Sequence, residues 1–193
     1  MAAPPASGSA VRPLPAPPVL VAGGGVTLRA VRPGDADEVA AVLEQHRDPQ
    51  VQRFTWIPDP YEQLHAEAFL ANAERGWRDG DLATFVVDVG GRYRGTVDLR
   101  PEPGAWAEIG FGLHPAARGR GVATRAVRRL LTWGFEELRL AGVTWRADVA
   151  NTASLGVALR CGFTVEGRVR GLLLHRGERV DGVIATLLAS DPR

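Results

Sequence analysis

Residues 106–136 constrain the fold of this chain more than any other stretch, because a strand pattern, a glycine-containing loop and a helix pattern follow one another there. In the run WAEIGFGL, which ends at Leu113, apolar residues alternate with Glu108 and two glycines, as in a strand that buries one face. The loop Arg-Gly-Arg-Gly follows at residues 118–121. Apolar residues then recur at helical spacing, at positions 122, 126, 127, 130, 131, 134 and 135. The sequence therefore predicts a strand, a tight loop and an amphipathic helix in direct succession.

This loop is suited to bind a polyanion. Gly119 and Gly121 allow the backbone to turn tightly and to approach a ligand closely. The first N–H groups of a helix lack partners within the helix, and the positive end of the helix dipole lies behind them. A pyrophosphate group matches such a site.

Two families that place a phosphate loop between a strand and a helix are excluded. A P-loop nucleotide hydrolase requires a lysine for the β- and γ-phosphates, whereas all 23 Lys+Arg residues of this chain are arginine. A Rossmann fold requires Gly-x-Gly-x-x-Gly early in a βαβ unit. Here the glycines are spaced differently and lie past the middle of the chain.

The loop resembles the Arg/Gln-x-x-Gly-x-Gly/Ala signature of the GNAT (general N-acetyltransferase) superfamily, with Arg118, Gly121 and Ala123 at its defining positions. The run Glu-Ile-Gly-Phe-Gly-Leu before the loop is similar to the fourth strand of that superfamily. Asn151-Thr-Ala-Ser154, followed by Cys-Gly-Phe at residues 161–163, resembles its downstream N-x-x-S…GF element. Glu-Gly-Arg at 166–168 and Arg-Gly-Glu-Arg-Val-Asp at 176–181 extend the resemblance to the RimJ/RimL-type branch, which acetylates the N-terminal residue of ribosomal proteins. The resemblance covers residues 26–188.

The resemblance and the residue patterns together predict a single α/β (α+β) domain. Its central sheet is expected to be mostly antiparallel and seven-stranded, in the order βααβββαβαββ, with the fourth and fifth strands splayed around the cofactor. The expected strands are 26–31, 84–89, 93–99, 106–113, 143–149, 168–174 and 180–188, and the expected helices begin near Asp35 and span 61–77, 122–136 and 152–160. Residues 1–25 are rich in Pro, Ala, Gly and Ser, and we interpret them as a flexible leader before an acetyltransferase domain at 26–193.

Composition disfavours several classes of protein. A net charge of +1 provides no general attraction to nucleic acid or to an anionic membrane, and no apolar run has the length of a membrane span. Nucleic-acid binding through Arg125, Arg128 and Arg129 is a weaker interpretation than a solvated helix face. The lone Cys161 cannot form an internal disulfide and is interpreted as a small buried residue, so a reducing cytoplasm is expected. The four histidines lack metal-ligand spacing, and no metal site is expected.

The resemblance implies acetyl-coenzyme A as co-substrate, without a metal, and it assigns site residues by position. Phe111 and Leu113 would lie beside the pantetheine arm, and Asn151 would bond it. Glu108 would accept a proton from the attacking amine, and Ser154 would donate one to the leaving thiolate. The pyrophosphate would lie on the loop and the first helical turn, at Arg118, Gly119, Arg120, Gly121, Val122, Ala123 and Thr124.

Each catalytic assignment has a structural alternative. Glu108 is equally interpreted as a strand carboxylate paired with an arginine on a neighbouring strand, and Asn151 as a helix cap. The Ser154 hydroxyl, in a first helical turn, is alternatively a solvated group. Many members of the superfamily use a tyrosine as general acid, yet Tyr61 and Tyr93 both precede the loop. The identity of the general acid therefore stays open at this point.

The function implied by the resemblance is direct transfer of an acetyl group from acetyl-coenzyme A to a primary amine in a ternary complex. A protein or peptide N-terminal α-amine is the expected acceptor, bound over the first two helices and the closing hairpin near Trp56. Two alternatives stay open: a small-molecule amine such as an antibiotic, an amino acid or a polyamine, and a non-catalytic module that binds acyl-coenzyme A. We expect a monomer or a homodimer.

Overall fold

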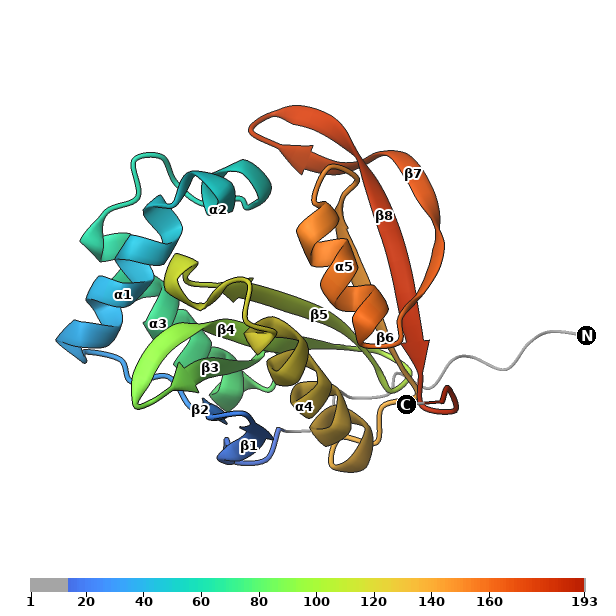
Figure 1. The fold of residues 1–193 in the computed structure, drawn as a ribbon, viewed down its shortest axis with the longest axis horizontal. Coiled ribbons are helices and arrows are strands. Elements are labelled where there is room, and N and C mark those ends of the chain that lie inside the picture. The colour runs from blue at the N-terminus through green and yellow to red at the C-terminus, as the bar shows by residue number, and fades with distance from the viewer. Residues whose placement is uncertain (1–13, 193) are drawn as a thin grey trace, which may run out of the picture.

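The computed structural model describes residues 14–192. Its centre is one sheet of eight strands in the order β1-β2-β3-β4-β5-β6-β8-β7 (Figure 1). Neighbouring strands are antiparallel except β5 and β6, which are parallel. The mixed, mostly antiparallel architecture predicted from the sequence is confirmed. The strands are β1 Leu20–Gly23, β2 Val26–Arg29, β3 Ala83–Val89, β4 Arg92–Glu102, β5 Trp106–Leu113, β6 Gly142–Asp148, β7 Thr164–His175 and β8 Glu178–Leu188.

The sheet has one strand more than the seven predicted, because the sequence pattern does not reveal β1. Leu20 pairs with Leu28 of β2, and its side chain is buried in the core. Three consecutive glycines at 23–25 adopt positive φ angles and connect the two strands tightly. Residues 20–23 fall in the segment interpreted as a flexible leader, so within the described residues that segment contributes a strand. Residues 1–13 of the predicted leader lie outside the described residues.

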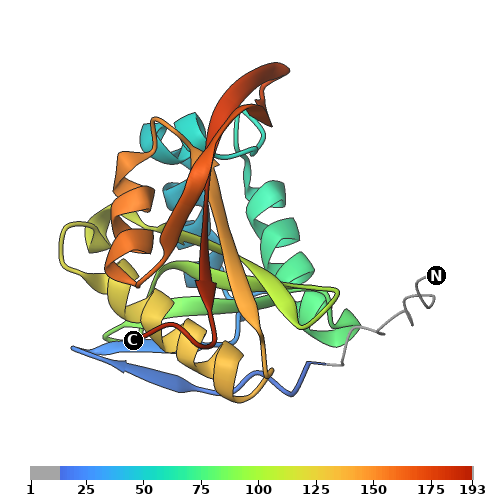
Figure 2. The same cartoon turned by 90° about the vertical axis from the view of Figure 1, so that its right-hand side faces the viewer.

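Helices cover both faces of the sheet (Figure 2). On one face, α1 (Ala36–Arg47) packs on β4, and α3 (Gln63–Asp79) packs on β3. On the other face, α4 (Val122–Glu136) packs on β1, β2, β4 and β5, and α5 (Thr152–Arg160) packs on α4 and β6. A short helix, α2 (Pro49–Phe54), follows α1 directly.

Helix α2 is absent from the prediction, although the sequence carries its start signal. Asp48 caps the helix by accepting hydrogen bonds from the amides of Gln50 and Val51, and Pro49 occupies its first turn. A second Asp-Pro pair at residues 59–60 carries the same signal just before the helix expected at 61–77, but no helix begins there. Helix α3 begins at Gln63, because Glu62 and His65 form the capping box.

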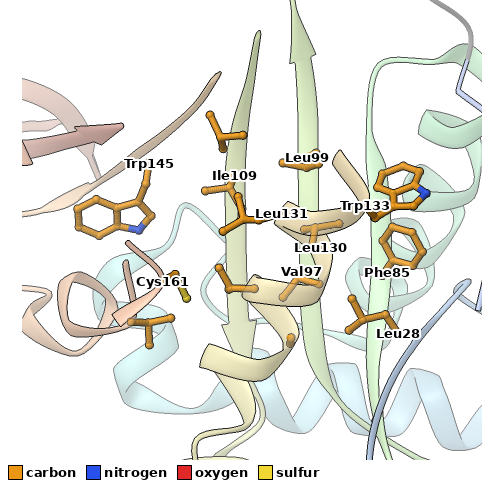
Figure 3. Packing of buried hydrophobic residues seen from close by; sticks show 14 of the residues in the cluster. Leu28, Phe85, Val97, Leu99, Ile109, Leu130, Leu131, Trp133, Trp145 and Cys161 are labelled. Carbon is orange, nitrogen blue, oxygen red and sulfur yellow. The ribbon is translucent and has the colours of Figure 1, made fainter. Parts of the chain in front are cut away.

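The larger apolar core lies between the sheet and helices α4 and α5 (Figure 3). The ring of Trp133 on α4 packs edge-on against Phe85 of β3, with ring centroids 5.3 Å apart. All seven positions of the predicted apolar stripe on α4 are buried. Ile109 of β5 is buried in the same core. Since this fixes the apolar face of β5 against α4, the opposite face presents Glu108 and the two glycines of the strand.

Candidate active site

The loop between β5 and α4 has the geometry of an anion cradle. A 3-10 turn at Pro115–Ala117 leads into it, and Gly119 and Gly121 adopt φ angles of 74° and 70°, which residues with side chains rarely adopt. Gly121 is the N-cap of α4, and no side chain caps the first amides of this helix. These amides can therefore bond a ligand, and the helix dipole favours a negatively charged one.

The Arg118 side chain holds the cradle in place rather than projecting into it. Its guanidinium donates hydrogen bonds to the carbonyl oxygen of Leu113, at 3.3 and 3.1 Å. It also bonds Gln50 Oε1 at 3.0 Å and Asp48 Oδ1 at 2.8 Å. Burial alone would raise the pKa of Asp48, but its hydrogen bonds with Arg118 and with backbone amides outweigh burial and lower that pKa. The arginine thus ties the cradle to the junction of α1 and α2.

Another arginine reaches the cradle from the helix. Arg125 donates a hydrogen bond from Nη1 to the carbonyl oxygen of Arg120 at 2.8 Å. Both side chains are exposed, so positive charge lies beside the loop. Val122 is buried and Ala123 packs against the core, whereas the Thr124 hydroxyl accepts a hydrogen bond from Arg160 at 3.3 Å. The sequence interpretation placed Arg125 on a solvated face and missed its contact with the loop.

Strands β5 and β6 run side by side only at their beginnings. Three residue pairs join them, the last between Glu108 and Thr144, and β5 then continues to Leu113 paired with β4 alone (Figure 1). The His114 amide bonds the Arg94 carbonyl on the β4 side. Because such bonds alternate along an antiparallel strand, the backbone groups of Phe111 and Leu113 face away from β4. The predicted divergence of these two strands is present.

Glu108 lies at the point where the two strands separate. Its carboxylate is paired with Arg146 of β6, and Arg100 Nη1 of β4 lies 4.0 Å from its other oxygen. The side chain is 19% exposed. These contacts are those of the structural alternative for Glu108, in which its carboxylate is paired with an arginine on a neighbouring strand.

Asn151 and Ser154 lie together at the start of α5, beyond the end of β6. The Asn151 side chain caps the helix by accepting a hydrogen bond from the Ser154 amide at 3.2 Å. The Ser154 hydroxyl accepts a hydrogen bond from Trp145 Nε1 at 3.2 Å. Both side chains are half-buried on the β6 side of the divergence.

Two buried polar residues that were not predicted lie on the face of β5 turned away from α4. Asp98 of β4 pairs across the sheet with Gly110, and Gln45 of α1 lies over Gly112. Asp98 Oδ1 and Gln45 Oε1 are both buried and accept no hydrogen bond in the structure. Burial raises the pKa of Asp98, Arg100 opposes that rise, and the negative charge of Glu108 adds to it. The burial of these two oxygen atoms results from tertiary contacts, so no local sequence signal indicates it.

The tip of the β7–β8 hairpin curls over α2 (Figure 1). Arg176, in the turn, bonds Gln52 of α2 at 2.8 Å, and its guanidinium lies 3.5 Å from Asp59. Trp56, in the loop between α2 and α3, is 63% exposed rather than part of the core. The hairpin and α2 therefore meet beside the diverging strands, where an acceptor was expected.

The family model described as an acetyltransferase (GNAT) domain matches residues 26–164. The chain belongs to the GNAT family. It is therefore an acetyl-coenzyme A-dependent N-acetyltransferase. No helix within residues 14–192 is long and apolar enough to cross a membrane, and no group of three or more histidine, cysteine or acidic residues there is placed to hold a metal ion.

Several GNAT proteins are similar along most of the chain. "Putative ribosomal N-acetyltransferase YdaF" of Bacillus subtilis is 30% identical over 168 residues, which cover 84% of this chain and 91% of the relative. Spermidine N(1)-acetyltransferase of Escherichia coli is 27% identical over 141 residues, which cover 72% and 74%. The solved structure of RimL, a ribosomal L7/L12 alpha-N-protein acetyltransferase in complex with coenzyme A, matches with a TM-score of 0.80 and 18% identity, covering 89% of this chain and 98% of that one. At that identity the RimL match establishes the shared fold.

Proposed function

We propose that this GNAT enzyme transfers the acetyl group of acetyl-coenzyme A to the α-amine at the N-terminus of a protein or peptide. The observation that carries the proposal is the divergence of β5 from β6 next to the uncapped start of α4. This arrangement places a free strand edge beside an anion cradle. The ribosomal acetyltransferase name of a relative 30% identical supports an N-terminal acceptor.

The residues along this edge fit the acyl donor, which supplies an activated acetyl thioester when bound. The first amides of α4 suit its pyrophosphate, with Gly119 and Gly121 leaving room for the approach. The backbone groups of Phe111 and the N–H of Leu113 suit the amides of the pantetheine arm, in the manner of an added strand, while the Leu113 carbonyl is bonded by Arg118. Asn151 uses its side-chain oxygen as a helix cap, which leaves its amide N–H groups to donate to the arm.

The reaction forms one C–N bond and breaks one C–S bond. An N-terminal ammonium has a reference pKa of about 8, so at pH 7 it must lose a proton before it can attack. The sequence-based prediction assigns that proton to Glu108. A backbone N–H of residues 110–113 would stabilise the negative charge on the thioester oxygen, and Ser154 would protonate the leaving thiolate.

Charge pairing on the acceptor side favours a single amine over a polycation. A polyamine requires carboxylates that are available to bind it. Three of the acids on the side of α2 and the β7–β8 hairpin are instead engaged with arginines, in the pairs Asp48–Arg118, Asp59–Arg176 and Asp181–Arg168. Since a relative 27% identical acetylates spermidine according to its name, a polyamine is the second candidate acceptor.

An acceptor screen that follows release of coenzyme A thiol tests the proposal. The panel contains peptides beginning with alanine or serine, the same peptides with a blocked N-terminus, spermidine, free amino acids and an aminoglycoside. We expect a kcat/KM for an unblocked peptide at least about tenfold above that for spermidine, and no turnover of the blocked peptides. A preference for spermidine would replace the proposed acceptor, and the absence of turnover with every amine would overturn the proposal.

A further inference from the structure

The face of β5 that is turned toward α1 is lined by glycines and by two unsatisfied hydrogen-bond acceptors. Among residues 14–192, three buried side-chain atoms lack a hydrogen-bond partner, and two of them are Asp98 Oδ1 and Gln45 Oε1. Asp98 is 9% exposed and Gln45 is 3% exposed. Asp98 Oδ1 forms an ion pair with Arg100 Nη2 at 3.0 Å but accepts no hydrogen bond, and Gln45 Oε1 accepts none either. Buried polar atoms without hydrogen bonds are costly, so each calls for an explanation.

Both acceptors belong to side chains that lie directly over this one strand. A Cβ atom built on Gly110 would lie 2.7 Å from Asp98 Oδ2 and 2.9 Å from Oδ1, and one built on Gly112 would lie 3.4 Å from Gln45 Nε2. The Asp98 carboxylate therefore occupies the space that a side chain at position 110 would need. Gly110 and Gly112 are only half-buried. The two acceptors thus lie beside the strand segment along which the acetyl thioester is proposed to lie.

We propose that Asp98 and Gln45 form the site that binds the attacking primary amine. This inference rests on the acetyl-transfer function proposed above. Asp98 Oδ1 accepts one N–H of the incoming ammonium and takes its proton, and Gln45 Oε1 accepts a second N–H. The nitrogen lone pair that is freed then attacks the thioester carbon, and the C–S bond breaks as the C–N bond forms. The sulfur leaves with the bonding electron pair, and the nitrogen loses a second proton as it becomes an amide. That second proton balances the one that the thiolate takes up through Ser154, while the first stays on Asp98 until it passes to solvent.

The surroundings of Asp98 suit this role better than those of Glu108. Glu108 is paired with Arg146 and also lies 4.0 Å from Arg100, whereas Asp98 has one ion pair, with Arg100 Nη2 at 3.0 Å, and its Oδ1 accepts no hydrogen bond. The raised pKa of Asp98, which burial causes, makes the carboxylate a stronger base than an exposed aspartate.

The other groups that face Asp98 are few. Arg100 lies on its own strand and Glu108 on β5. The neutral Thr84 of β3 lies opposite it, and the side chain that α1 places over the neighbouring Gly112, Gln45, is neutral. The proton affinity of Asp98 is therefore set by burial and by these two charges, and removing the charge of Glu108 should lower that affinity.

The decisive experiment compares Asp98→Asn with Glu108→Gln, using an alanine-starting peptide as acceptor and its N-acetylated form as the blank. We expect Asp98→Asn to lower kcat/KM by about a hundred- to ten-thousandfold, with unchanged affinity for acetyl-coenzyme A in calorimetry. Glu108→Gln should cause a smaller loss and should move the acid limb of the pH–rate profile to lower pH, because the charge that raises the pKa of Asp98 is gone.

Thermal unfolding separates catalysis from a structural role. An ionised carboxylate whose folded pKa is raised destabilises the fold above its unfolded pKa, so Asp98→Asn should keep or increase the melting temperature at pH 7. A structural aspartate would behave in the opposite way. Gln45→Met, which removes the acceptor but keeps the length of the side chain, should raise the KM for the peptide by about tenfold, and Gln45→Glu should restore part of the affinity.

Three outcomes would overturn the site. Wild-type kcat/KM in Asp98→Asn would overturn it while leaving the proposed function intact, and so would a larger loss in Glu108→Gln. A destabilised Asp98→Asn that also loses coenzyme affinity would assign Asp98 to structure. Absence of thiol release by the wild-type protein with every amine of the screen would instead remove the proposed function, and this site with it.

Discussion

Nη2 of Arg118 lies 2.8 Å from Oδ1 of Asp48, although the two residues are 70 positions apart in the chain. The contact joins the cradle before α4 to the start of α2, which is the side expected to receive the acceptor. The same guanidinium bonds the Leu113 carbonyl at the end of β5. One side chain therefore connects the strand edge, the cradle and the acceptor side.

Asp48→Asn should weaken the fold in a pH-dependent manner. Asparagine keeps the helix cap but removes the charge that Arg118 bonds, so we expect a loss of about 1–2 kcal/mol in the free energy of unfolding at pH 7. The folded pKa of Asp48 lies below its ordinary value, so its contribution is present above the unfolded pKa and is lost as pH falls through the folded pKa. The free energies of unfolding of the two proteins, measured by urea titration at several acidic pH values, should therefore approach one another as the pH falls. A difference that does not change with pH would mean that the charge is unimportant.

Gly121→Glu should abolish binding of acetyl-coenzyme A without unfolding the protein. The substitution puts a carboxylate at the amides that are proposed to bond the pyrophosphate. Gly121→Ala is the matched control, because it brings the same backbone strain at φ 70°, about 1–2 kcal/mol, without the charge. Calorimetry should detect binding to the alanine variant and none to the glutamate variant. Equal affinities would show that the cofactor lies elsewhere.

Arg176→Ala should weaken acceptor binding and leave cofactor binding unchanged. Its contacts with Gln52 and Asp59 hold the β7–β8 turn against α2, and both charged side chains are largely exposed. Exposed pairs contribute little, so we expect a rise of less than about tenfold in KM for a peptide, with little change in kcat. Arg179→Ala, on the same hairpin but without contacts to α2 among the hydrogen bonds of the described residues, serves as the control. A fall in affinity for acetyl-coenzyme A would contradict this division of roles.

Cys161 should be unreactive in the folded protein. Burial raises the pKa of its thiol to about 11, although Arg128 and Arg160 oppose the rise, so little thiolate forms at pH 8. A thiol reagent should label the native protein slowly and the unfolded protein at once. Cys161→Ala should keep its acetyl-transfer activity. Rapid labelling, or loss of turnover in this variant, would contradict the interpretation of Cys161 as a buried apolar residue.

The elements that could be predicted are those whose signals are local. The alternation in β5, the glycines at 119 and 121 and the apolar stripe of α4 lie within one continuous stretch, and their structure follows from that stretch alone. β1 was missed because its four residues are too few to show a period and follow a proline-rich segment. The start of α3 was misplaced because two Asp-Pro pairs carry the same signal and only the first begins a helix.

The polar contacts of the site could not be predicted, because they depend on strand register and on helix packing. Nothing near Asp98 in the sequence indicates that its carboxylate lies over Gly110, a residue on the next strand. Arg118 was expected to bond phosphate, and its partner Asp48 is known only from the folded chain. A motif can locate a cofactor loop, whereas the side chains that face a substrate come from several separate parts of the chain.

The short pairing between β5 and β6 means that the sheet is joined at its middle by three residue pairs. In the proposed complex, the arm of the coenzyme lies where further β5–β6 residue pairs would be, and it takes the place of those pairs in the sheet. The folded enzyme would then gain stability in proportion to the logarithm of the coenzyme concentration, by about 2.7 kcal/mol at a hundred times the dissociation constant. Comparisons of melting temperature between variants consequently depend on the amount of coenzyme that remains bound after purification.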